Sequence, residues 1–190
     1  MFEPTVAAVM DQVDALRNNV DDHWQVPRVE AQLLAQLVRL GRCTSVCEIG
    51  TSYGFSTLHL ASAVRDNGGR LYTFDMSPKK VTAATEHLRQ AALLDVVTLT
   101  LGDARELVAK VTPDKPYDFA FIDATKDQSS AYLAALLPKL AQRAILATDN
   151  TTTHRDQLAD FVAQLRALPG ATSCDVPVGN GFELTLIERR

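Results

Sequence analysis

The sequence predicts an α/β fold: a doubly wound, mostly parallel seven-stranded sheet with helices on both faces and a C-terminal antiparallel hairpin. Three observations predict it. Short, mainly apolar runs alternate with helical patterns after about residue 45, as in right-handed βαβ crossovers. The apolar character of these runs indicates strands that are covered on both faces. Finally, Gly179-Asn180-Gly181 makes a turn-like break between two closing strand patterns.

Each element follows from its local pattern. Residues 4–17 form an amphipathic helical pattern that ends in a polar stretch, and residues 29–40 form a second one that Gly41 stops. The expected parallel strands span residues 45–49, 71–74, 96–101, 117–122 and 144–147. The alternating helices span residues 56–64, 78–92, 104–111, 129–140 and 155–168. The closing antiparallel strands span residues 171–178 and 182–188.

Length and composition predict a single domain. With 190 residues and 46% hydrophobic content, the chain can bury one substantial core, and no linker-like stretch divides it. We therefore expect one domain over residues 1–190, with a helical cap at 1–41 and the core at 42–190. The net charge of -4 and the scattered basic residues disfavour nucleic acid and anionic membranes as partners.

The cysteines and the N-terminus predict a cytoplasmic location. The three cysteines show no CxxC spacing, which favours buried thiols in a reducing compartment over a disulfide or a metal site. No basic start precedes an apolar signal core, and no apolar run approaches the length of a membrane span. We therefore expect no membrane partner.

Polar residues follow two of the predicted strands. Asp123 comes directly after the strand at 117–122, and Asp149-Asn150 follow the strand near 144–147. The carboxyl ends of neighbouring parallel strands lie at one edge of a sheet, so these side chains are expected to converge. Carboxylate and amide oxygens suit Mg²⁺ or another hard divalent cation. Either Asp alone could simply cap the next helix, but the set favours a metal site.

A glycine loop joins the first strand to a helix. In Glu48-Ile49-Gly50-Thr51-Ser52-Tyr53-Gly54-Phe55-Ser56-Thr57, two glycines permit a sharp turn and close approach of a ligand to the backbone. The spacing is not the GxGxxG of dinucleotide folds, so the loop alone is a weak signal. Asp75, after the second strand, could bind both ribose hydroxyls of a nucleotide, and Asp103, after the third, could bind an adenine amino group. Each could instead cap the helix that follows it.

Taken in order, these motifs resemble a known family. From Glu48 to Asn150 the chain is similar to class I S-adenosylmethionine-dependent O-methyltransferases, in the metal-dependent branch that includes catechol and caffeoyl-CoA O-methyltransferases. The similarity extends to Trp24-Gln25-Val26 and reappears in Val176-Pro177-Val178-Gly179-Asn180-Gly181. It implies a Rossmann-like core, S-adenosylmethionine as cofactor with S-adenosylhomocysteine as product, and a divalent cation such as Mg²⁺.

The resemblance also implies roles for individual residues. The implied metal ligands are Asp123, Asp149 and Asn150. Lys126, in the family's Asp-x-x-Lys-Asp segment, would be the general base, beside Asp123 in the catalytic site. The residues implied in cofactor binding are Val26, Glu48, Gly50, Ser52, Gly54, Ser56, Asp75, Met76, Asp103, Ala104 and Asp123.

One segment departs from the family. The family's long insertion after the Asp-Asn pair is essentially absent, because Asn150 is followed by Thr151-Thr152-Thr153-His154 and then by a helical pattern. The missing insertion counts against acyl-CoA and simple catechol specificity and predicts a wide, open pocket. The acceptor that the resemblance implies is a hydroxylated small molecule, catechol-like or otherwise vicinally dihydroxylated. His154 could line that pocket, and Trp24 could cover it.

Several alternatives remain open at the level of sequence. The chain could be a methyltransferase that needs no metal, with Asp123 and Asp149 serving only as caps. It could act on hydroxyuridine in tRNA, although the acidic balance disfavours RNA. It could also be a non-catalytic S-adenosylmethionine-binding regulatory module. A homodimer is possible, because the first amphipathic helix could pack across a two-fold axis.

Overall fold

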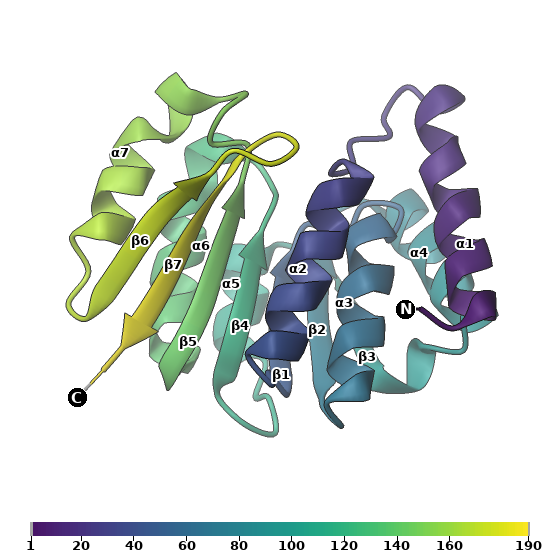
Figure 1. The fold of residues 1–190 in the computed structure, drawn as a ribbon, viewed down its shortest axis with the longest axis horizontal. Coiled ribbons are helices and arrows are strands. Elements are labelled where there is room, and N and C mark those ends of the chain that lie inside the picture. Colours follow the sequence, from purple (N-terminus) through teal and green to yellow (C-terminus); the bar gives the residue numbers. More distant parts are fainter. Residues whose placement is uncertain (1, 190) are drawn as a thin grey trace.

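The computed structural model describes residues 2–189 and contains one seven-stranded sheet in the order β3-β2-β1-β4-β5-β7-β6 (Figure 1). The strands are β1 Ser45–Ile49, β2 Arg70–Asp75, β3 Val97–Leu101, β4 Tyr117–Ile122, β5 Leu140–Asp149, β6 Ala171–Val176 and β7 Phe182–Glu188. The α-helices are α1 Pro4–Ala15, α2 Arg28–Leu40, α3 Phe55–Asp66, α4 Pro78–Gln90, α5 Ala104–Lys110, α6 Ser129–Leu136 and α7 Arg155–Arg166. Short 3-10 turns are η1 Leu16–Asn18, η2 Leu94–Val96, η3 Lys126–Gln128 and η4 Leu137–Lys139.

The strand directions confirm the predicted fold class. Strands β1 to β5 pair in parallel, whereas β7 runs antiparallel between β5 and β6. The β6–β7 hairpin turns at the predicted glycine-rich segment, with Val176 paired to Phe182. Because the chain leaves β1 toward one edge of the sheet and later enters β4 on the other side of β1, the strand order reverses between β1 and β4. Open sheets of this kind bind ligands at the carboxyl ends of the strands beside such a switch point.

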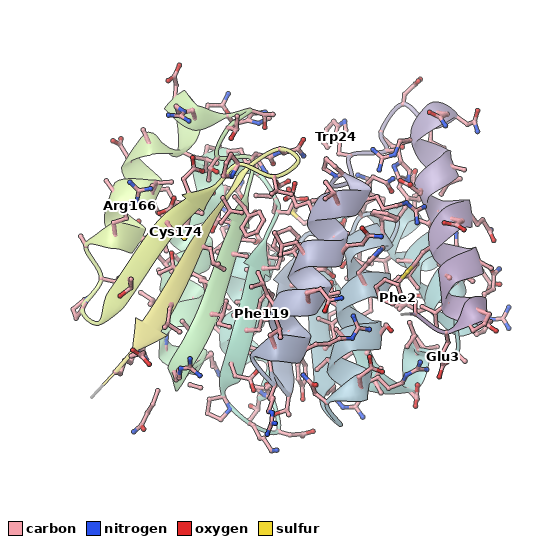
Figure 2. The ribbon with its side chains drawn as sticks, viewed as in Figure 1. Phe2, Glu3, Trp24, Phe119, Arg166 and Cys174 are labelled. Atoms are coloured by element: carbon pink, nitrogen blue, oxygen red, sulfur yellow. The ribbon has the colours of Figure 1, made fainter. Side chains whose placement is uncertain are left out.

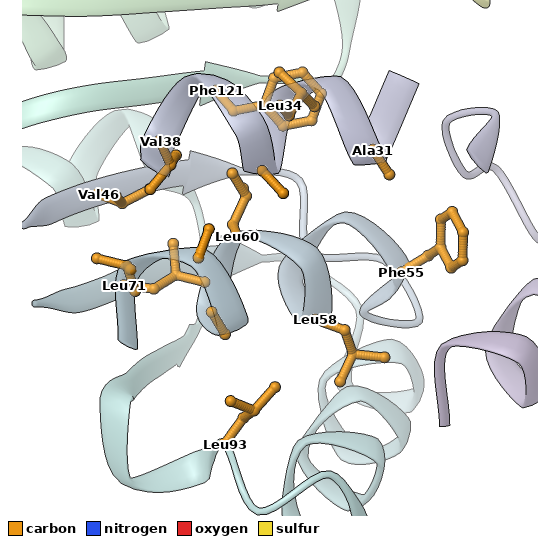
Figure 3. Packing of buried hydrophobic residues seen from close by; sticks show 14 of the residues in the cluster. Ala31, Leu34, Val38, Val46, Phe55, Leu58, Leu60, Leu71, Leu93 and Phe121 are labelled. Atoms are coloured by element: carbon orange, nitrogen blue, oxygen red, sulfur yellow. The ribbon is translucent and has the colours of Figure 1, made fainter. Parts of the chain in front are cut away.

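The two faces of the sheet carry separate hydrophobic cores. Helices α1 to α4 contribute to the first core, in which Leu34, Phe55 and Leu58 pack with Phe121 and other buried side chains (Figure 3). Helices α5, α6 and α7 cover the opposite face, in a core that includes Val108, Leu133 and Phe161. Alternate residues of each central strand join opposite cores, which keeps the strands rigid and fixes the loops that follow them.

Two boundaries differ most from the sequence-based expectation, and the others agree to within about two residues. The helix predicted at 129–140 ends at Leu136, because Pro138 follows, and the next residues form the 3-10 turn η4. Strand β5 begins at Leu140 rather than near residue 144, since Leu140 already pairs with Tyr117 across a register shift in β4. The longer β5 passes through exposed Gln142 and Arg143, whose polarity hid this part of the strand from the hydrophobic pattern.

Candidate active site

A cavity of about 670 Å³ opens at the carboxyl ends of the parallel strands, on both sides of the β1–β4 switch point. Loops after β1, β2 and β3 form one half of its wall, and loops after β4 and β5 form the other. Among the site residues predicted from sequence, those that line it are Gly50, Ser52, Asp75, Met76, Ala104, Asp123, Lys126, Asp149 and Asn150. The structure therefore brings both groups of predicted residues to a single cavity.

Gly50 sits where the two halves meet. Its φ of +107° lies in a region that glycine favours, and a Cβ there would lie 1.9 Å from the Asp123 carbonyl oxygen. The Asp123 N–H in turn donates to the Ile49 carbonyl oxygen at 2.9 Å. The loop after β1 and the start of the loop after β4 are thus in backbone contact, and only glycine permits this spacing.

Hydrogen bonds hold the acids of the β1–β2 half in place. The Asp75 carboxylate accepts the backbone N–H of Ser52 at 2.7 Å and that of Ser77 at 2.8 Å. Glu48 is fully buried, and its carboxylate accepts hydroxyl protons from Ser56, Thr57 and Thr73 at 2.6 to 2.7 Å. Burial nevertheless raises the pKa of Glu48 to about 7, and the three hydroxyl donors oppose that rise.

Five predicted cofactor residues do not line the cavity: Val26, Glu48, Gly54, Ser56 and Asp103. Val26, Glu48 and Ser56 are buried beneath its wall, and Gly54 is the N-cap of α3. Asp103 is the N-cap of α5, where its carboxylate accepts the Arg105 backbone N–H and pairs with the Arg105 guanidinium. The Arg105 guanidinium, and then the Arg105 backbone N–H, lower the pKa of Asp103. For Asp103 the structure therefore shows the capping alternative, while its neighbours Gly102 and Ala104 line the cavity.

The acids of the β4–β5 half have few partners. Asp123 Oδ1 accepts from Lys126 Nζ at 3.0 Å, and these side chains are 20% and 16% exposed, respectively. Asp149 is buried, and its Oδ1 accepts the Asn150 N–H at 2.6 Å. Burial, and then the nearby Asp149 charge, raises the pKa of Asp123 to about 6. Asn150 adopts a φ of +72°, a left-handed conformation that Asn tolerates better than most residues.

Sequence reasoning missed Glu30, a third acid in this half. Its side chain is fully buried, its Oε2 accepts the Asn180 N–H at 3.0 Å, and its Oε1 has no hydrogen-bond partner. Its carboxyl group is close enough to that of Asp149 for each to influence the pKa of the other. Burial, and then the contact with Glu30, raises the pKa of Asp149 to about 8, and burial also raises the pKa of Glu30. One feature of the sequence could have indicated that Glu30 is buried: it lies on the apolar face of α2, in line with Leu34 and Val38.

The outer wall of the cavity is polar and aromatic. Trp24 lines it while 78% exposed, at the same end of the molecule as the β6–β7 loop (Figure 2). Lys80 Nζ lies 5.1 Å from the centroid of the Trp24 ring. His154 and Thr153 of the short loop after Asn150 also line the cavity, joined by a 3.0 Å contact between Nδ1 and Oγ1. The loop between β5 and α7 is short and spans residues 150–154.

Comparisons with known proteins agree with the fold and the cavity. Residues 47–151 match the family model described as "Methyltransferase domain". A catechol O-methyltransferase of Mycobacterium tuberculosis is 29% identical over 206 residues, covering 97% of this chain and 89% of the relative. Caffeoyl-CoA O-methyltransferase 2 of Petunia hybrida is 27% identical, covering 82% of this chain and 73% of the relative.

A solved structure shares the fold. The O-methyltransferase from Bacillus cereus, in complex with SAH, has a TM-score of 0.84 and 23% sequence identity, and the match covers 98% of this chain and 91% of that one. At this identity the likeness shows the fold alone.

The match over more than half of its length shows that the chain belongs to the methyltransferase domain family. The prediction of a class I S-adenosylmethionine-dependent O-methyltransferase is confirmed by this match together with the O-methyltransferase relatives. As a separate finding, none of the helices within residues 2–189 combines the length and the apolar character that crossing a membrane requires.

Proposed function

We propose that the enzyme transfers a methyl group from S-adenosylmethionine to a hydroxyl of a small, catechol-like or otherwise vicinally dihydroxylated acceptor, with the help of a divalent cation. The observation that carries this proposal is the single cavity in which Asp75 and the glycine loop face the acids that follow β4 and β5. A methyl donor and a chelating acceptor could meet there at the β1–β4 switch point.

The β1–β2–β3 half is the proposed cofactor site. Asp75 would bind the ribose hydroxyls with the carboxylate lone pairs that its two backbone donors leave free. Gly50 and Ser52 would follow the methionine part, and Gly102 and Ala104 would face the adenine. When bound, S-adenosylmethionine supplies a methyl group on a positively charged sulfur, ready for attack by an oxygen nucleophile. The Bacillus cereus neighbour with bound SAH supports this use of the fold.

The donor set of the β4–β5 half fits a hard divalent cation. Asp123, Asp149 and Asn150 offer two carboxylates and an amide oxygen along one side of the cavity. The raised pKa values of Asp123 and Asp149 reflect burial and like-charge contacts that a cation would relieve. Bound there, such a cation would hold two adjacent acceptor oxygens and favour the ionised form of one.

Lys126 is the proposed proton acceptor. Its Nζ lines the cavity beside Asp123 and is mostly shielded from solvent, so it can meet an acceptor hydroxyl only inside the cavity. Asp123 orients the amine through the 3.0 Å contact, and Lys126 takes the hydroxyl proton when neutral. Alignment is the larger contribution, because positioning can supply roughly 7–11 kcal/mol, against about 10²–10⁴-fold in rate for a general base.

The residues of the outer wall of the cavity support a small, polar acceptor and a broad range of acceptors. Trp24 offers an exposed aromatic face, and Thr153, His154 and Asn180 offer hydrogen-bonding groups around the same opening. Because the loop between β5 and α7 spans only residues 150–154, it would leave room for substituents on the acceptor ring.

A methylation assay tests the proposal. Purified enzyme, S-adenosylmethionine and a panel of catechols are incubated with Mg²⁺ and, in parallel, with excess EDTA. We expect methylated catechol only in the presence of the metal. Turnover that survives EDTA would favour the metal-independent methyltransferase, and tight cofactor binding without turnover on any acceptor would favour a regulatory module.

A further inference from the structure

We propose that Glu30 of α2 is a positioning residue of the cation site, which holds the Asp149 carboxylate in place and adds a third negative charge beside it. This inference rests on the proposed function, because it concerns the affinity of the same site for a divalent cation. It assigns a role to a residue outside the loops that follow β4 and β5.

The charges around Asp149 do not balance. Glu30, Asp123 and Asp149 supply three carboxylates, and Lys126 is the basic side chain within residues 2–189 that ion-pairs with any of them. When all four groups are ionised, two negative charges remain in a buried region. A buried charge is costly unless it is paired or coordinates a metal, so this excess matches the charge of one divalent cation.

Two segments of the chain hold Glu30 in its position. Pro27 precedes the helix that carries it, and the Glu30 N–H donates to the Pro27 carbonyl oxygen at 3.0 Å. The Asn180 N–H of the β6–β7 loop donates to Oε2. At Gly179, with a φ of +65°, a Cβ would lie only 2.5 Å from the same oxygen, so the loop approaches this closely because residue 179 is glycine.

The remaining oxygen of Glu30 points to a role beyond packing. Oε1 is buried without a hydrogen-bond partner, although the side chain lies against Asp149. An acid in the first turn of a helix can stabilise that helix from an exposed position, so helix stability alone does not explain this burial. No three His, Cys, Asp or Glu side chains within residues 2–189 converge closely enough to hold a metal by themselves. We therefore assign Glu30 to the support of Asp149 rather than to direct coordination.

Calorimetric titration with Mn²⁺ tests the inference on wild type and on Glu30→Gln. Gln keeps the shape of the side chain and an oxygen for the Asn180 N–H, so the substitution removes mainly the charge. Loss of such supporting groups typically costs 10–100-fold in metal affinity, and we expect the Mn²⁺ Kd to weaken by about 10-fold or more. The Kd for S-adenosylmethionine should stay within about 2-fold, which also shows that the variant is folded.

The matched control is Asp118→Asn. Asp118 also anchors backbone, since its carboxylate accepts the N–H groups of Thr44 and Ser45. It lies near the amino ends of β1 and β4, away from the cavity at their carboxyl ends. Its Mn²⁺ affinity should equal that of wild type. An unchanged Mn²⁺ Kd in Glu30→Gln would overturn the inference while leaving the proposed function standing, whereas no Mn²⁺ binding by wild type would overturn both.

A second variant covers the case in which Glu30→Gln does not fold. Glu30→Asp keeps the charge and draws it away from Asp149 by one methylene. A Mn²⁺ Kd about 10-fold weaker than that of wild type would support the positioning role. A Kd equal to that of wild type would overturn it.

Discussion

The two halves of the cavity differ in how their acids are satisfied. In the half after β1 and β2, Glu48 has three hydroxyl donors and Asp75 has two backbone donors. In the half after β4 and β5, Lys126 and one backbone N–H are the donors to Asp123 and Asp149. In the first half, both oxygens of each carboxylate therefore accept hydrogen bonds from the protein itself. In the second half, one carboxylate oxygen of Asp123 and one of Asp149 have no donor among the described residues, and such oxygens are the ligands that a hard cation prefers.

Asp149→Ala should give the largest effect. It removes one proposed cation ligand and the acid that Glu30 supports, and with it the alignment of the acceptor. We expect turnover to fall by at least about 10³-fold. Steady-state assays with Mg²⁺ measure it, and calorimetry should show S-adenosylmethionine affinity within about 2-fold of wild type. Equal losses of turnover and of cofactor affinity would show that the halves are not independent.

Lys126→Met tests the role of Lys126 as general base separately from the role of the cation. Met removes the amine but keeps an unbranched side chain, so we expect a fall in kcat of about 10²–10³-fold, with S-adenosylmethionine affinity unchanged. The pH dependence of kcat measured on wild type and variant provides the check. A variant with wild-type kcat would remove Lys126 from the mechanism.

Gly50→Ala tests the contact between the halves. The added Cβ meets the Asp123 carbonyl oxygen and the backbone is left in an unfavourable φ, so we expect a loss of at least about 3 kcal/mol in the free energy of unfolding. Urea denaturation measures it. Gly68→Ala is the matched control, because Gly68 also has a positive φ of +71° but open space around its Cβ. The control should lose only about 1 kcal/mol, and equal losses would show that the close approach at Gly50 is not needed.

Asp75→Asn should affect the cofactor half alone. Loss of a charged hydrogen-bond acceptor costs about 1.5–3 kcal/mol, so we expect the Kd for S-adenosylmethionine to weaken by about 10–100-fold. Calorimetry with Mn²⁺ on the same variant should give the wild-type metal affinity. A parallel loss of Mn²⁺ binding would contradict the division into two halves.

The pH dependence of stability concerns the buried carboxyl groups of both halves. The pKa values of Asp123, Glu48 and Asp149 are raised to about 6, 7 and 8, mainly by burial, so the folded protein binds more protons than the unfolded chain above about pH 4. The free energy of unfolding therefore falls as pH rises from 5 to 8, because each of the three carboxyl groups loses in this range a proton that the folded protein binds more tightly than the unfolded chain does. Urea denaturation in EDTA at several pH values measures it, and a rise across this range would contradict the result.

The sequence predicted what depends on local pattern. Strands β1 and β4 are mainly apolar runs whose apolar residues pack into one or the other core, so their positions were visible, as was the acid that follows β4. Asp123, Asp149 and Asn150 could be placed at one cavity because parallel strands end at a common edge.

Contacts between distant segments could not be predicted in this way. Glu30 precedes Asn180 by 150 residues, and only the folded chain shows that the β6–β7 loop donates to its carboxylate. Asp103 was ambiguous because capping and ligand binding use the same residue type, and its pairing with Arg105 depends on side-chain geometry. The long β5 was hidden by its exposed polar residues.

Diffraction data collected at the manganese absorption edge, from crystals grown with Mn²⁺ and S-adenosylhomocysteine, would test the central claim most directly. The account predicts one anomalous peak bound by oxygens of Asp123, Asp149 and Asn150, with the Glu30 carboxylate against Asp149. Ordered S-adenosylhomocysteine with no anomalous peak at these residues would contradict it, because the β4–β5 half would then carry its excess of acids without binding a cation.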